Sequence, residues 1–159
     1  MKETGFHHTI AVTEKYKPIG GEMVLYERSV DEGNVLLNEG INNLLTLAEG
    51  AGGNPYSNAT AFIGVGDSAT AAAAAQTGLQ AASNKAWAAM EATYPTFGTS
   101  QQIVFKASFA SGVGNFEWLE YSVGNSNDDS GENLNRATFS KGTKVVGEVW
   151  TLTVTITLS

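Results

Sequence analysis

Two carboxylates in the segment NFEWLEYSVGN, residues 115–125, are the first candidates for chemistry. A glycosidase uses a pair of acidic side chains, and Glu117 and Glu120 are close enough in sequence to suggest one. The segment alternates like a strand, however, and strand residues three apart point to opposite faces. We therefore predict that they do not share a substrate. Glu120 is instead expected to pair across strands with Arg136, an interaction contributing at most about 1 kcal/mol if exposed.

Other catalytic patterns are missing from the chain. His7 and His8 are the two histidines, and neighbouring residues on a strand face opposite ways, which makes them a poor metal clamp. There is no G-x-S-x-G nucleophile motif, and there are no cysteines for thiolate metal sites or disulfides. We expect no catalytic residue, no metal and no enzymatic activity.

A loop rich in oxygen ligands spans residues 125–133. Carboxylate and amide oxygens are the ligands that Ca²⁺ prefers, but the EF-hand pattern alternates its acids, whereas Asp128 and Asp129 are adjacent. A solvated loop is the favoured interpretation, and a calcium site is the alternative. The potential ligands are Asn125, Asn127, Asp128, Asp129, Glu132 and Asn133.

The segment FIGVGDS, residues 62–68, contains G-x-G after a buried strand. A dinucleotide site needs a third glycine that opens a helix within a βαβ unit, and this segment lacks it. We expect a tight turn at the end of the strand and no bound cofactor.

Aromatic residues fall on several predicted strands, where core packing is the default. Aromatic rings also stack on sugars, so a carbohydrate-binding face is the functional alternative, provided that several rings are exposed on one side. The residues concerned are Trp87, Phe105, Phe109, Phe116, Trp118, Phe139 and Trp150.

Composition narrows the function class. The 159 residues are long enough for one domain with a substantial core. Only 16% are charged, against about 25% in a typical soluble domain, which suits a subunit packed into an assembly. The net charge of −7 and the scattered basic residues argue against nucleic-acid binding. The N-terminal residues show no apolar h-region and no segment has the length of a membrane helix, so we expect neither a signal peptide nor a membrane partner.

The last residues, VWTLTVTITLS, give the strongest structural signal. Apolar residues and threonines alternate from Trp150 to Leu158, as in a strand with one apolar and one hydroxyl-bearing face. A bare edge on such an uncharged strand would be an aggregation hazard. We therefore expect this strand to be central in its sheet or covered by another subunit.

One helix is predicted near residues 34–49, with apolar residues at helical spacing. Asn34 is its expected N-cap and Gly50 its expected stop, while Gly40 costs about 1 kcal/mol relative to alanine. The residues of the apolar stripe are Leu37, Ile41, Leu44, Leu45 and Ala48.

About eight short strands, separated by Gly, Asn and Ser, make up the rest. SGVG, residues 111–114, is expected to be a hairpin loop, and residues 67–78 a loop with one helical turn. The fold class is mainly β: an antiparallel, jelly-roll-like β-sandwich over residues 34–159. Residues 1–33 form either an N-terminal arm or a strand pair.

The order of six segments resembles small structural proteins of tailed bacteriophages: NEGINNLL, AFIGVGDS, TGLQA, IVFKASFASGVGNFEWLEYSVGN, LNRATFSKGTK and WTLTVTITL. The resemblance covers roughly residues 34–159. It implies a non-enzymatic virion protein, made in the host cytoplasm and bound to the capsid exterior as a decoration, or cement, subunit.

The implied partners are the major capsid protein and further copies of the chain, a trimer being one arrangement. A tail- or fibre-associated protein is the alternative within this class, and a carbohydrate-binding module for host attachment is the alternative outside it. Residues 1–33 are the first candidate for an element that bridges subunits.

Overall fold

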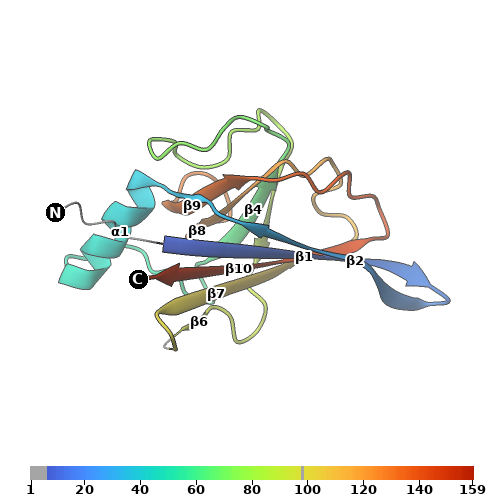
Figure 1. Ribbon diagram of the computed structural model, residues 1–159, viewed down its shortest axis with the longest axis horizontal. Coiled ribbons are helices and arrows are strands. Elements are labelled where there is room, and N and C mark those ends of the chain that lie inside the picture. The colour runs from blue at the N-terminus through green and yellow to red at the C-terminus, as the bar shows by residue number, and fades with distance from the viewer. Residues whose placement is uncertain (1–6, 98) are drawn as a thin grey trace.

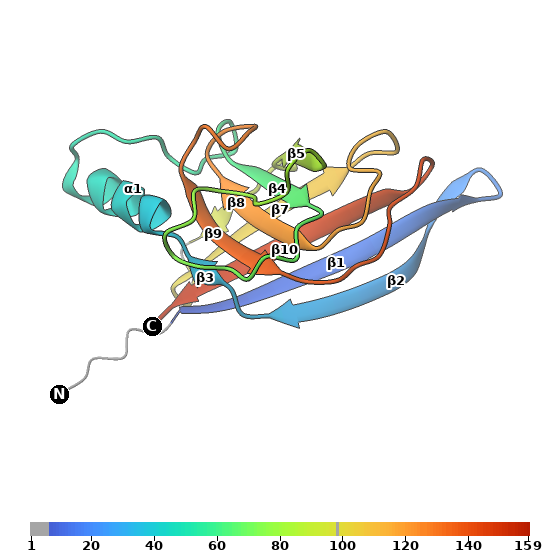
Figure 2. The same cartoon turned by 90° about the horizontal axis from the view of Figure 1, so that it is seen from above.

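Two antiparallel sheets packed face to face form the protein in the computed structural model, which describes residues 7–97 and 99–159 (Figures 1 and 2). Each sheet has five strands, and one short helix lies at one end of the long axis. The antiparallel β-sandwich predicted from the sequence is confirmed.

Sheet A has the strand order β2-β1-β10-β7-β6. Its outer strands are β2 and the very short β6, and β10 lies at its centre. The strands are β1 (His7–Ile19), β2 (Glu22–Glu32), β6 (Thr96–Phe97), β7 (Gln102–Phe109) and β10 (Val149–Leu158).

Sheet B has the order β3-β9-β8-β4-β5. Its longer strands are joined by consecutive hairpins, β4 to β5 and β8 to β9. The strands are β3 (Val35–Leu36), β4 (Phe62–Gly66), β5 (Lys85–Ala89), β8 (Glu120–Gly124) and β9 (Asn133–Thr138).

Strand β10 is paired along both edges, as its uncharged sequence requires. It runs antiparallel to β1 from the pair His7–Leu158 to Tyr16–Val149, and to β7 from Trp150–Phe109 onward. The expectation of a central strand is confirmed, and the hazard of an unpaired edge is removed.

The alternation of β10 also builds the core. Trp150, Leu152 and Val154 are almost fully buried between the sheets. The Trp118 ring stacks edge-on against Phe109 and Trp150, with centroids 4.7 and 4.9 Å apart. Such edge-to-face pairs stabilise beyond the area that they bury.

Residues 7–32 form a strand pair in which β1 lies between β2 and β10. Residues 1–6 lie outside the described residues. Because β1 is an interior strand, removing residues 1–33 would expose the edge of β10, so this segment is no dispensable extension of the sandwich.

The helix α1 (Asn38–Glu49) begins four residues later than Asn34, so Asn34 is not its N-cap. The Asn34 side chain instead accepts a hydrogen bond from Thr9 Oγ1 at 3.0 Å, tying the chain to β1. Leu37 occupies the cap position in extended conformation, without a side-chain cap bond. Gly50 ends the helix with φ 76°, as expected.

The apolar stripe predicted for this helix is only partly used. Leu37 is buried and Leu44 packs against the core, but Ile41 and Leu45 are exposed, Leu45 by 62%. The residues that α1 buries are Gly40 and Asn43. The helix therefore presents apolar side chains to solvent.

The SGVG segment is not a hairpin loop. It leaves β7 in sheet A and leads to β8 in sheet B, so it crosses between sheets. Residues 125–132 instead connect the hairpin strands β8 and β9. Ten strands are present in the described part of the chain rather than about eight, since two-residue strands such as β3 and β6 are too short to show periodicity.

Substitution of Gly40 tests how tightly α1 packs on sheet B. A Cβ at this position would lie 2.4 Å from Leu134 Cα, a backbone atom that cannot yield easily. We therefore expect Gly40→Ala to lower the unfolding free energy by about 1–3 kcal/mol through overpacking, despite the better helix propensity of alanine. Chemical denaturation measures the change.

The matched control is Gly112→Ala, because a Cβ there meets nothing within 4 Å and the backbone needs no positive φ. Its unfolding midpoint should match that of the parent. If Gly40→Ala were neutral or stabilising, the close contact between α1 and β9 would be contradicted.

Candidate functional site

A buried ion pair joins β8 to β9 on the outer side of sheet B. Arg136 Nε lies 2.7 Å from Glu120 Oε2, and neither side chain is exposed to solvent. The residues are brought near each other because Ser122 is the register partner of Arg136, two residues along β8 from Glu120. The predicted pairing is therefore present, but it is buried rather than exposed.

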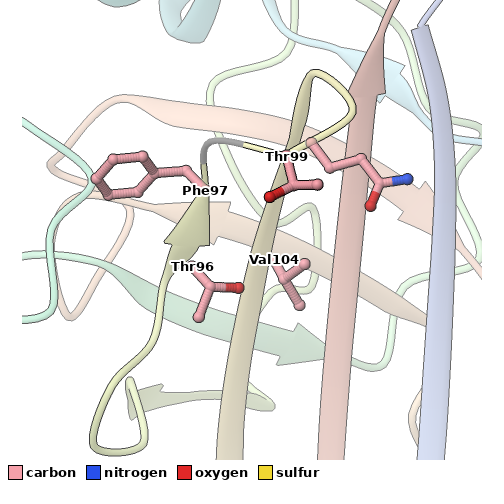
Figure 3. Close-up of a pocket in the computed structure, with 5 residues that line it drawn as sticks. Thr96, Phe97, Thr99 and Val104 are labelled. Atoms are coloured by element: carbon pink, nitrogen blue, oxygen red, sulfur yellow. The ribbon is translucent and has the colours of Figure 1, made fainter.

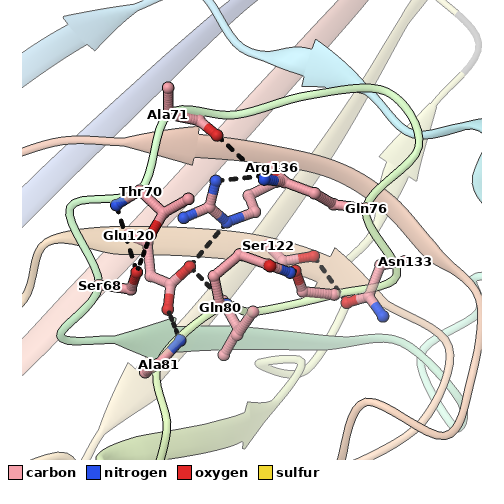
Figure 4. Close-up of polar contacts among 12 residues, drawn as sticks. Ser68, Thr70, Ala71, Gln76, Gln80, Ala81, Glu120, Ser122, Asn133 and Arg136 are labelled. Carbon is pink, nitrogen blue, oxygen red and sulfur yellow. Dashed lines mark hydrogen bonds and ion pairs between the residues drawn. The ribbon is translucent and has the colours of Figure 1, made fainter.

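The loop at residues 67–84 covers this pair and is held by it (Figure 4). Glu120 accepts hydrogen bonds from the backbone amides of Gln80 at 2.9 Å and Ala81 at 2.7 Å. Arg136 Nη1 donates to Gln76 Oε1 at 3.1 Å. We call this alanine-rich loop, residues 67–84, the strap. Its hydrogen bonds with Glu120 and Arg136 hold it against the outer face of sheet B.

This arrangement is suited to structure rather than acid–base catalysis. Both carboxylate oxygens of Glu120 already accept hydrogen bonds from the protein. Glu117 is exposed and lies before β8 begins, so the two carboxylates do not form a pair.

The two glycines of FIGVG lie within β4 rather than in a turn. A Cβ on Gly64 would lie 2.7 Å from the Trp87 ring, and one on Gly66 would lie 2.4 Å from Glu120 Oε1. The expected tight turn is wrong: the glycines make room for a ring and a carboxylate above the strand.

The acidic residues of loop 125–133 face different partners. Asp129 Oδ2 lies 2.5 Å from Lys85 Nζ, while Glu132 Oε2 accepts a hydrogen bond from Asn125. Hydrogen bonds donated by Ser130 lower the pKa of Asp128. Within residues 7–97 and 99–159, no three His, Cys, Asp or Glu side chains gather as metal ligands.

The histidines follow the strand geometry expected for them. His7 lies with Nε2 2.9 Å from Asn34 Oδ1, whereas His8 is exposed. Their register partners are the consecutive residues Leu158 and Thr157, which face opposite sides of sheet A.

Most of the aromatic residues considered for sugar stacking are internal. Trp87 lies outside the core, with its ring over Gly64, and Phe116 packs against the core from its rim. The remaining five belong to the core between the sheets: Phe105, Phe109, Trp118, Phe139 and Trp150. These seven rings do not form an exposed platform.

Buried lysines are a feature that the sequence analysis missed. Lys15 lies 2.7 Å from Glu27 and 4.4 Å from the Trp150 ring centroid. Lys141 donates to Ser29 Oγ at 3.0 Å and pairs with Asp31. Lys15 of β1 also donates a hydrogen bond to the Lys141 carbonyl, so the two lysines join β1 and β2 to the segment that precedes β10. Only their long alkyl stems hint at partial burial.

The outer face of sheet A is an uncovered surface built from regular strands. Thr153 and Thr155 of β10 are half-buried, and their register partners on β1 are Val12 and Ile10. No loop or helix crosses β1, β10 or β7 on this side in Figure 1. We call this surface the threonine face; its half-buried uncharged residues are Ile10, Val12, Val104, Thr153, Thr155 and Thr157. Glu14 and Lys106 lie on the same face, as register partners of Thr151 and Thr153.

Comparisons with protein-family models, curated proteins and solved structures find no match. Among the described residues, no helix has the length and apolar character to cross a membrane.

The effects of replacing Glu120 and Arg136 on the unfolding free energy should depend strongly on each other. Because Glu120 and Arg136 are fully buried, we expect Glu120→Ala or Arg136→Ala alone to cost about 3–5 kcal/mol by leaving an unpaired buried charge. The double variant should lose less than the sum of the two. Urea denaturation of the four proteins measures this coupling.

The control cycle uses Glu14 and Arg28, whose closest atoms are 3.7 Å apart at the surface. Its coupling should stay below about 1 kcal/mol. Additive losses at Glu120 and Arg136 would contradict the structural role of the buried pair.

We expect calcium to leave the melting temperature unchanged, because loop 125–133 has no free set of carboxylate ligands in the structure. Its carboxylates are already engaged with Lys85, Asn125 and Ser130, so millimolar CaCl₂ should leave the melting temperature equal to that in EDTA. Differential scanning calorimetry measures both. A calcium-specific rise, absent with MgCl₂, would restore the calcium-site alternative.

Proposed function

We propose that the protein is a structural subunit of a tailed-phage virion that adheres to the capsid exterior as a decoration protein. The observation that carries this proposal is the threonine face: a strand surface of threonine and β-branched side chains, with ion pairs beside Thr151 and Thr153, that no other element of the described chain covers. The resemblance of the segments from residue 34 to 159 supplies the virion context.

The outer faces of the two sheets differ in their side chains and in whether a loop covers them. Sheet B carries polar groups beneath the strap at residues 67–84, which engages Glu120 and Arg136. Sheet A carries threonine hydroxyls and β-branched side chains and has no strap. A partner surface on sheet A would therefore meet a preformed area whose ion pairs lie beside Thr151 and Thr153.

The proposed mechanism is mechanical. The side chains of β10 on the opposite face are locked in the core, so the threonine face is held rigidly and little conformational entropy is lost on binding. Threonine hydroxyls can donate and accept hydrogen bonds, while their methyl groups remove apolar area from water. Binding across neighbouring capsid subunits would add contact area that resists expansion of the shell.

The threonine face also carries charged side chains, which form ion pairs near one end of β10. Lys106 lies 3.3 Å from Glu91 and Arg28 lies 3.7 Å from Glu14. These pairs are near Thr151 and Thr153, whereas Thr155 and its register partners Ile10 and Val104 carry no charge. Across β1, β10 and β7, the row through Thr155 is therefore uncharged, and the nearest charge in that row is Glu32 on β2, the register partner of Ile10.

A charge at Thr155 should weaken adhesion. We expect Thr155→Glu to bind purified heads lacking the protein at least about tenfold more weakly, equivalent to about 1.4 kcal/mol, because an unpaired carboxylate would be buried in the interface. Co-sedimentation with the heads measures binding.

Thr77→Glu is the control, since it makes the same change on the exposed strap over sheet B. Circular dichroism should show that both variants keep the parent fold. Unchanged head binding by Thr155→Glu would reject the threonine face as the adhesive surface. Binding to tails rather than heads would favour the tail-associated alternative, and specific glycan-array hits would favour the carbohydrate-binding module.

A further inference from the structure

The β1–β2 hairpin extends beyond the sandwich. Strand β1 pairs with β10 only as far as Tyr16, and from Lys17 onward it pairs with β2 alone. Figure 2 shows the turn projecting from one end of the molecule. The hairpin tip, residues 17–26, is exposed throughout.

The exposed tip is apolar. A two-stranded ribbon is only marginally stable in water, yet Ile19 is 53% exposed, Met23 45% and Leu25 44%. The base of the ribbon is fixed, because Tyr26 donates to Glu148 Oε1 at 2.8 Å and Lys15 pairs with Glu27. The tip is therefore an anchored apolar projection, and its apolar side chains are exposed rather than packed against the described part of the chain.

An apolar groove lies at the other end of the molecule, between α1 and the β6–β7 edge. It consists of two hollows of about 180 and 360 Å³ that share Leu44, Tyr56 and Ile103. Figure 3 shows Phe97 at the end of β6 pointing away from Thr96, Thr99 and Val104. The Phe97 ring is 80% exposed at the rim of the larger hollow, and the half-exposed Leu158 lines the smaller one.

The hairpin tip and the groove lie at opposite ends of the molecule, and both are mainly apolar. Figure 1 places α1 and the β1–β2 turn at opposite ends of the long axis. The residues that line the two hollows carry no charge, and neither do residues 18–21 and 23–26 of the tip. The tip also contains Lys17 and Glu22, one charge of each sign, so its net charge is zero. Because the whole chain has a net charge of −7, copies repel one another on average, and contact between the tip and the groove adds little to that repulsion.

We infer that the hairpin tip of one copy inserts into the groove of the next copy. Such a contact is heterologous: two different surfaces meet, so the copies close into a ring or extend as a filament, depending on the rotation between them. The inference requires no capsid and stands independently of the proposed function. In a decorated shell it would link neighbouring subunits while each threonine face remained free to bind.

Complementation between two variants tests the inference. One variant, Met23→Asp with Leu25→Asp, disables the tip; the other, Phe97→Asp with Leu158→Asp, disables the groove. All four residues are at least 44% exposed, so the fold should be retained, as circular dichroism can verify. Sedimentation equilibrium measures the mass of each protein and of their mixture.

The parent should form concentration-dependent oligomers and each variant should stay at 16.7 kDa. The equimolar mixture should form a dimer of twice that mass, because one intact tip and one intact groove remain. A parent that stays monomeric, a variant that still assembles alone, or a mixture that stays monomeric would each overturn the inference.

Engineered cysteines give a second test that does not depend on the charged variants. The chain contains no cysteine, so Met23→Cys and Phe97→Cys each introduce one thiol. Under mild oxidation, the mixture should yield the 23–97 disulfide dimer faster than either variant yields a homodimer. Equal rates for all pairings would contradict insertion of the tip into the groove.

Discussion

The backbone pairing of β10 with β1 on one edge and β7 on the other is the constraint on which the structure depends. It converts an uncharged, aggregation-prone sequence into the centre of a sheet. It also assigns each residue of the strand to one face, with Trp150, Leu152 and Val154 in the core and the threonines outside. Since β1 supplies one of these edges, the N-terminal strand is as essential to the sandwich as the C-terminal one.

The outer faces of the two sheets have separate roles in this account. On sheet B, the Glu120–Arg136 pair and its hydrogen bonds hold the strap at residues 67–84 in place, so buried polar groups serve internal structure. On sheet A, the threonine face is the surface that we propose for contact with another protein. The apolar tip and groove lie at the two ends of the long axis, so lateral adhesion and end-to-end association do not compete for the same residues.

The sequence predicted those features whose cause is local. The period-two pattern of β10 was sufficient to place its side chains, and Gly50 was sufficient to end the helix. The predicted Glu120–Arg136 pair is present, but its burial depends on the strap, which no local pattern reveals. Likewise, the turn residues at 111–114 indicate a change of chain direction but not the sheet to which the next strand belongs. Asn34 accepts a hydrogen bond from Thr9 instead of capping α1, because this tertiary contact prevailed over the local preference of asparagine for the N-cap position. The exposed Phe97 and the groove could not be foreseen, since the groove is lined by residues from α1, β6 and β7 that are far apart in the sequence.

Electron cryomicroscopy of the intact virion tests the central claim most directly. The account predicts density for this sandwich on the outside of the head, with Thr153, Thr155 and Val104 facing the major capsid protein and the strap of sheet B facing outward. A map in which the chain is present with its threonine face open to solvent, or in which the chain is absent from the head, would contradict it.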